Sequence, residues 1–129
     1  MFPKRYQKGE KKYNNSKTIV NGITFISKFE AWIYGCLLQL WAEIIELQPR
    51  YLLQDKYKTK DGRNIRKIEF VSDFVVSLFG KKYIIEAKGQ ETEAFKIKRK
   101  WFEFLYPDET LVIVKSQKQL REFYLTLKK

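Results

Sequence analysis

The chain has 129 residues, 44% of them hydrophobic and 16% aromatic, which is enough for one domain with a core and excludes a largely disordered chain. Its 26 Lys and Arg against 15 Asp and Glu give a net charge of +11, which favours a polyanionic partner, with nucleic acid ahead of an acidic membrane surface or a charge that only aids solubility. The absence of histidine excludes imidazole-dependent hydrolases and zinc sites, so any catalysis must use carboxylates and lysine.

The first 18 residues are polar and basic, whereas hydrophobic patterning begins near residue 19. We therefore predict a flexible N-terminal segment over 1–18 and a single domain over 19–129. The segment is either a solvated tail or an element that binds phosphates. Its candidate DNA-binding residues are Lys4, Arg5, Lys11 and Lys12.

The sequence lacks the features of a secreted or membrane protein. The N-terminus has no apolar signal region, and no apolar run approaches the roughly 18 residues needed to cross a bilayer. The lone cysteine, Cys36, lies in an apolar helical pattern, which indicates a buried thiol in a reducing compartment. We expect a cytoplasmic protein, in the host cytoplasm if the chain is phage-encoded, with no membrane contact.

A short hairpin and a long helix are predicted first along the chain. Residues 19–26 indicate a short hairpin or an extended segment, with Asn21-Gly22 as the turn. Ser27 and Glu30 have the spacing of a capping box, and a helix is expected to run from there and end before Gln48-Pro49. Its apolar stripe comprises Phe29, Trp32, Ile33, Cys36, Leu37, Leu40, Trp41 and Ile44.

The remaining elements alternate between strands and helices. Turn signals at 60–63 and at Gly80-Lys81 separate apolar runs, and Thr92 and Ser116 are expected to cap helices. The predicted strands cover residues 51–57, 65–78, 83–87 and 111–114. This order predicts an α/β fold with an αβββαβ core, a mixed sheet flanked by helices, and a C-terminal helix.

A cluster of charged residues is expected where the strand over 83–87 ends. Side chains alternate along a strand, so Glu86 and Lys88 share one face. Asp73 interrupts the apolar strand before it, and a hairpin through Gly80 would bring Asp73 close to Glu86. Two adjacent carboxylates repel, and a divalent cation such as Mg²⁺ would relieve that repulsion.

For several other residues, both a functional and a purely structural interpretation are open. Glu30 either joins the metal site or only completes its capping box, and Gln48 either contacts a phosphate or caps the first helix. The basic residues of the second helix either bind the DNA backbone or form a solvated face; they are Lys96, Lys98, Arg99 and Lys100. Four aromatic residues are expected to pack in the core or a dimer interface rather than to stack on bases; they are Trp32, Trp41, Trp101 and Phe102.

Asp73, followed after a hairpin by Glu86-Ala87-Lys88 and preceded by a helix glutamate, Glu30, resembles the motif of the PD-(D/E)xK nuclease superfamily. Within it, the chain looks most like short bacteriophage endonucleases of the endonuclease I or Holliday-junction-resolvase type, over roughly residues 20 to 115. The similar stretches are 22–30, 47–51, 72–74, 86–89 and 95–98. Ser72 stands where the superfamily pattern has proline, a position expected to shape a bend rather than to bind metal.

The resemblance implies a restriction-endonuclease-like fold, Mg²⁺ or Mn²⁺ as cofactor, and cleavage of DNA that leaves 5′-phosphate and 3′-hydroxyl ends. It also implies a homodimer acting on branched DNA in recombination. Asp73, Glu86 and the Ala87 carbonyl would hold the metal, with Glu30 at a second or outer position, and Lys88 would act on the attacking water. The alternatives are a sequence-specific or transposon-type end-cleaving nuclease and a nucleic-acid-binding module without catalysis.

Overall fold

The computed structural model describes residues 17–128, so the candidate residues Lys4, Arg5, Lys11 and Lys12 lie outside its description. Within the described residues the protein is a mixed α/β domain with three helices, and none of the three is long and apolar enough to cross a membrane. The predicted fold class, including the C-terminal helix, is confirmed.

The central sheet has four strands in the order β10-β9-β8-β3. They are β3 (Glu43–Leu47), β8 (Phe74–Leu78), β9 (Lys81–Ala87) and β10 (Leu111–Val114). β8 pairs antiparallel with β3 and β9, whereas β10 runs parallel to β9 and is reached through α2 (Glu93–Leu105). Together with α1 (Lys28–Gln39) before them, these elements have the predicted order αβββαβ.

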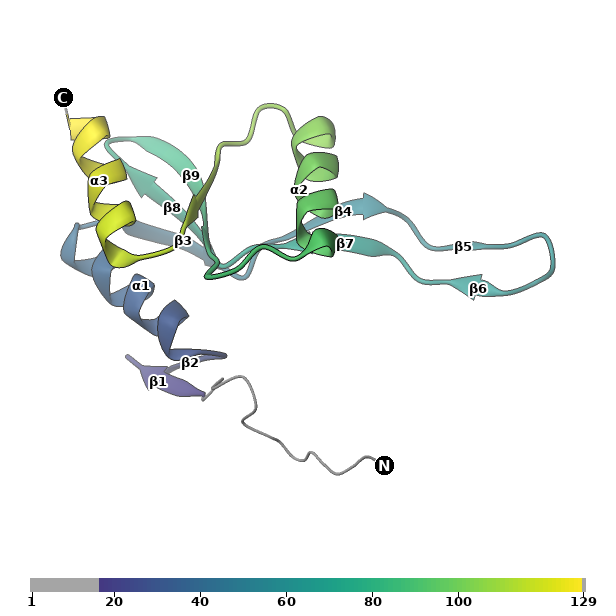
Figure 1. Ribbon diagram of the computed structural model, residues 1–129, viewed down its shortest axis with the longest axis horizontal. Coiled ribbons are helices and arrows are strands. Elements are labelled where there is room, and N and C mark those ends of the chain that lie inside the picture. The colour runs from purple at the N-terminus through teal and green to yellow at the C-terminus, as the bar shows by residue number, and fades with distance from the viewer. Residues whose placement is uncertain (1–16, 129) are drawn as a thin grey trace.

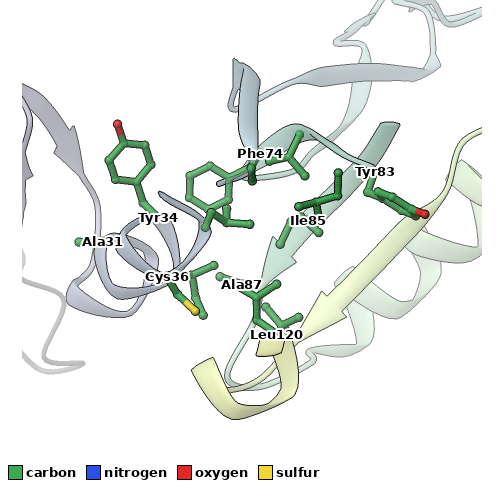
Figure 2. Packing of buried hydrophobic residues seen from close by; sticks show 14 of the residues in the cluster. Ala31, Tyr34, Cys36, Phe74, Tyr83, Ile85, Ala87 and Leu120 are labelled. Atoms are coloured by element: carbon green, nitrogen blue, oxygen red, sulfur yellow. The ribbon is translucent and has the colours of Figure 1, made fainter. Parts of the chain in front are cut away.

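Helices cover both faces of the sheet (Figure 1). α1 and α3 (Gln117–Lys128) pack on one face, where Tyr34 and Cys36 of α1 and Leu120 of α3 meet Phe74 and Ile85 (Figure 2). α2 packs on the other face. Neighbouring residues of β9 therefore serve different clusters, because successive side chains of a strand point to opposite faces.

A two-stranded extension is inserted in the sequence between β3 and β8. It consists of β4 (Arg50–Gln54) paired with β7 (Ile68–Val71) and, beyond a break, β5 (Tyr57–Lys58) paired with β6 (Asn64–Ile65). Figure 1 shows this extension projecting past α2. A second small hairpin, β1 (Thr18–Val20) with β2 (Ile23–Phe25), precedes α1.

Most of the predicted turns and caps are confirmed. Asn21 and Gly22 both have positive φ, as the predicted hairpin turn requires. The side chains of Ser27, Thr92 and Ser116 accept hydrogen bonds from backbone N–H groups at the starts of their helices. The hairpin before β9 turns at Phe79-Gly80, one residue earlier than predicted.

The prediction of one long first helix is wrong. α1 ends at Gln39, Trp41 adopts a left-handed backbone conformation with a φ of 60°, and residues 43–47 form β3. Ile44 and Ile45 are β-branched and favour a strand once β8 supplies hydrogen-bond partners. The first core strand is therefore β3, and the predicted strand over 51–57 is divided between β4 and β5 of the extension.

Two further expectations need correction. The predicted strand over 65–78 is divided into β6, β7 and β8, with the second break at Ser72-Asp73. Core packing is confirmed for Phe102, which is fully buried, and Trp101 packs against the same cluster. Trp32, on α1, and Trp41 are exposed and lie outside the core, and for Trp41 the reason is that the helix expected to bury it has already ended. Packing of these two residues in a dimer interface stays a prediction.

Candidate active site

The pairing of β8 with β9 brings Asp73 to the end of β9. In this antiparallel ladder Phe74 lies opposite Ile85, so the residue before Phe74 lies beside the residues after Ile85. The Asp73 Oδ2 atom accepts a hydrogen bond of 2.7 Å from the Ala87 backbone N–H. This bond continues the connection between the strands after the regular ladder has stopped, and it fixes the Asp73 carboxylate next to Glu86.

Glu86 is buried, and both of its carboxylate oxygens have partners. Oε1 lies 2.9 Å from the hydroxyl of Ser72, and Oε2 lies 3.3 Å from the ammonium of Lys88. The Ser72 hydroxyl also lies 3.2 Å from the Ile85 carbonyl oxygen, and its side chain is as buried as that of Glu86. Ser72 therefore orients the carboxylate, a role that its position in the sequence pattern does not suggest.

The ammonium of Lys88 is held from two sides. It pairs with Glu86 and lies 4.6 Å from the centre of the Phe95 ring, which belongs to α2. About a third of the Lys88 side chain remains exposed, 32% by accessible surface. The strand register thus presents a positioned cation at the mouth of an otherwise buried acidic site.

The electrostatics of the three acidic residues link them into one group. Burial, followed by the charges of Glu86 and Glu30, raises the pKa of Asp73 to about 8. Burial also raises the pKa of Glu86, against the opposing effect of Lys88, and burial with the charge of Glu86 raises the pKa of Glu30. Glu30 therefore faces the site from the first turn of α1, while its backbone N–H donates to Ser27.

Gln48 reaches the site through an unusual backbone conformation. It has a φ of 51°, and its N–H donates a 2.8 Å hydrogen bond to the carbonyl oxygen of Asp73. The N–H of Ser72 donates to the carbonyl oxygen of Pro49 at 3.1 Å. A cavity of about 120 Å³ lies beside this crossing, and its lining includes Glu30, Gln48 and Asp73. Strained backbone held in place by tertiary contacts is common in functional sites.

A hard divalent cation suits the chemistry of these donors, which are carboxylate and carbonyl oxygens. As the side chains stand in residues 17–128, no three acidic or cysteine side chains form a complete metal-binding group. Burial raises the pKa of all three carboxyl groups, and the charge of Glu86 adds to this effect at Asp73 and Glu30, so a cation bound beside them would favour their ionised forms. A complete ligand set would require side-chain rotation, chiefly of Glu86 away from its present partners.

The four basic residues of α2 differ in whether a carboxylate already pairs with them. Lys96 pairs with Glu93 at 3.4 Å, and Arg99 lies 3.7 Å from carboxylates of both Glu91 and Glu103. Lys98 is half-buried and Lys100 is exposed, and neither has a carboxylate partner within the described part of the chain. The sequence prediction treated these four residues as equivalent, whereas two of them are already paired.

Residues 10–121 match the model of a family described as "Protein of unknown function (DUF1064)", and the chain therefore belongs to that family. No curated protein and no solved structure matches the chain.

Proposed function

We propose that this member of the DUF1064 family is a divalent-metal-dependent DNA endonuclease that hydrolyses phosphodiester bonds, with selectivity for branched DNA. The observation that carries the proposal is the hydrogen bond from the Ala87 N–H to Asp73, which holds one carboxylate beside the Glu86–Lys88 pair. The net charge of +11 supports a polyanionic substrate. A homodimer in the cytoplasm is part of the same proposal.

Asp73, Glu86 and the Ala87 carbonyl would hold Mg²⁺ or Mn²⁺, with Glu30 adjoining them. When bound, such an ion supplies Lewis acidity toward a phosphate and a more acidic water. Glu86 is buried and Asp73 and Glu30 are half-buried, so less water screens the charge interactions there than at the surface. Ser72 holds the Glu86 carboxylate within the site, and rotation of the Glu86 side chain would complete the set of ligands around the ion.

Lys88 is the side chain that we assign to the scissile phosphate. Its ammonium is fixed between a carboxylate and an aromatic ring, so it acts as a hydrogen-bond donor and a positive charge. In that role it orients the attacking water and stabilises the charge that develops on the phosphate oxygens. Gln48, which lines a cavity together with Glu30 and Asp73, would contact a phosphate oxygen or that water.

The test is incubation with a labelled four-way junction, a linear duplex and a single strand, each with and without Mg²⁺. We expect Mg²⁺-dependent symmetric nicks in the junction. Glu86→Ala and Lys88→Ala should lower the cleavage rate by on the order of 10³-fold while junction binding persists. Glu122→Ala and Lys118→Ala, exposed charges on α3, are the matched controls and should cleave as the wild type does.

Three other outcomes would contradict the proposal at different levels. Undiminished metal-dependent cleavage by both site variants would remove the active-site assignment. Cutting of linear duplex at one sequence would replace branch selectivity with the end-cleaving alternative. Salt-sensitive binding with no Mg²⁺-dependent product would favour a binding module without catalysis.

The proposed homodimer has a test of its own. Light scattering should give about twice the 15.6 kDa chain mass, and a monomer would contradict the homodimer.

A further inference from the structure

The extension between β3 and β8 has two parts with different surroundings. The inner part, β4 with β7, is anchored to α2: Phe70 stacks on Phe102, and the Tyr106 hydroxyl donates to the Leu52 carbonyl oxygen at 2.8 Å. The outer part, residues 55–67, comprises β5, β6 and their turn and is called the outer hairpin here. Figure 1 shows the outer hairpin extending beyond α2 with no helix packed against it.

The outer hairpin is strongly basic. It holds six Lys and Arg against Asp55 and Asp61, a net charge of 6 − 2 = +4 in 13 residues. Arg63 pairs with Asp61, and Lys67 pairs with Glu69 of β7. The other four cations are exposed and have no carboxylate partner in the part of the chain that the structure describes; they are Lys56, Lys58, Lys60 and Arg66.

The register of the outer hairpin sorts its side chains onto two faces. Lys58 lies opposite Asn64 and Tyr57 lies opposite Ile65, so one face carries Lys58 with Asn64 and the other carries Tyr57 with Ile65. Two apolar residues make too small a patch to insert into a membrane surface. Charge, rather than apolar area, is therefore what this segment offers to a partner.

An open hollow of about 780 Å³ lies where the two strand ladders separate. Lys56, Arg66 and Lys67 line it from both strands, together with Asn64, Tyr57 and Ile65. Asp55 also lines the hollow, and its carboxylate accepts a 2.8 Å hydrogen bond from the Lys56 backbone N–H. Lys56 and Arg66, the two cations of the hollow without a carboxylate partner in the described part of the chain, suit a chain of phosphates better than a single neutral ligand.

We propose that the outer hairpin binds the duplex DNA of the substrate away from the cleavage site, through phosphate contacts of Lys56, Lys58 and Arg66. A two-stranded ribbon fits the major groove of B-DNA, which is about 12 Å wide. Each strand of the outer hairpin has about six residues and spans roughly 20 Å, enough to reach past one groove edge. This assignment rests on the proposed function for the identity of the substrate, and it concerns affinity rather than the chemical step.

The test compares two variants that lose the same charge. Lys56→Ala/Lys58→Ala/Arg66→Ala removes three cations from the outer hairpin, and Lys81→Ala/Lys118→Ala/Arg121→Ala removes three exposed cations near β9 and α3. Binding of a labelled duplex and a four-way junction is measured by fluorescence anisotropy in EDTA, between about 50 and 200 mM salt. Circular dichroism and the Tm establish that both variants are folded.

The hairpin variant should raise the Kd roughly tenfold or more, and its log Kd should depend on log salt with a slope shallower by about 2 to 3, the loss expected for three phosphate contacts. The control variant should stay within about twofold of the wild type. At saturating protein, single-turnover cleavage of the junction by the hairpin variant should match the wild-type rate. Lys56→Arg/Lys58→Arg/Arg66→Lys should restore binding.

Equal losses in both variants, or no loss in the hairpin variant, would overturn the assignment. It would also be overturned if the hairpin variant became a monomer by light scattering while the wild type and the control remained dimers, because the outer hairpin would then contact a second copy of the chain. A wild-type protein that binds through the hairpin but cleaves nothing would contradict the proposed nuclease and leave the hairpin assignment standing.

Discussion

The acidic site at the end of β9 and the outer hairpin differ in both charge and exposure. Glu86 is only 4% exposed and shares its oxygens between two neighbours, whereas Lys56 and Lys58 are exposed on a hairpin that projects from the domain. Buried charges interact strongly because little water screens them, while exposed charges are screened by water and salt. Changes at the site should therefore depend on one another, and changes at the outer hairpin should add.

The largest expected effect is the pH dependence of stability that comes from Asp73. Its pKa is about 8 in the folded protein against an ordinary value of 3.8, so the folded state holds a proton that the unfolded state releases between these values. The resulting stabilisation is complete below pH 3.8 and is lost as the pH rises through 8. In EDTA, the wild-type Tm should therefore fall between about pH 5 and pH 8.5, a window set by that raised pKa.

Asp73→Asn should reduce this fall, leaving the part that comes from the raised pKa values of Glu86 and Glu30, and give a Tm higher by roughly 4 °C or more near pH 8. The exposed control, Asp108→Asn, should keep the wild-type profile. Mg²⁺ added near pH 8 should raise the Tm of the wild type more than that of Asp73→Asn, because binding to the folded state stabilises it. Parallel pH profiles for the wild type and Asp73→Asn would show that burial and the neighbouring acids do not disfavour the ionised form of Asp73.

The sequence predicted those helices and strands whose pattern or cap lies within the element itself. Period-two and period-three-to-four patterns, together with the caps at Ser27, Thr92 and Ser116, located most helices and strands. The end of α1 could not be read in this way. Apolar residues continue at helical spacing past Gln39, and only pairing with β8, some 30 residues later, makes residues 43–47 a strand.

The proximity of Asp73, Glu86 and Lys88 could be predicted because strand alternation and a hairpin suffice to bring these three residues together. The supporting contacts were not predicted. Ser72 was expected to shape a bend, yet it hydrogen-bonds Glu86, and this depends on a β8–β9 register that one residue's identity does not reveal. The alternation of Lys56, Lys58 and Lys60 was visible in the sequence, but its exposure follows only from the projection of the hairpin.

Ser72→Ala is expected to have an intermediate effect on cleavage. It removes the hydroxyl that orients Glu86 while leaving every charge in place, so kcat should fall about tenfold, the scale of one hydrogen bond to a charged group, with DNA binding unchanged. The Ser72 hydrogen bond lowers the pKa of Glu86 against the larger raising effect of burial. Its loss should therefore move the acidic limb of the pH–rate profile to higher pH.

The matched control is Ser77→Ala, a half-buried hydroxyl farther along β8, which should retain the wild-type rate and pH profile. Ser72→Pro, which supplies the residue of the superfamily pattern, should lose more than Ser72→Ala because the Ser72 N–H also donates to Pro49. An unchanged pH–rate profile in Ser72→Ala would mean that Glu86 is held without the hydroxyl, and the low solvent exposure of Ser72 would then reflect packing only.

The smallest expected effect tests whether the outer hairpin acts through particular contacts or through net charge. Hydrogen bonds from Thr59 and then Arg63 lower the pKa of Asp61, so this carboxylate is ionised at neutral pH. It forms an ion pair with the Arg63 guanidinium, whose Nε lies 3.1 Å from Oδ2. Asp61→Asn should free Arg63 for a phosphate, tighten duplex binding by about twofold to threefold, and steepen the salt slope by about 1.

Asp108→Asn is the matched control, because it changes the net charge equally at another exposed position, after α2. If both variants gain equal affinity, long-range attraction explains the gain and the hairpin makes no privileged contact; a gain confined to Asp61→Asn requires the DNA to reach the tip of the hairpin.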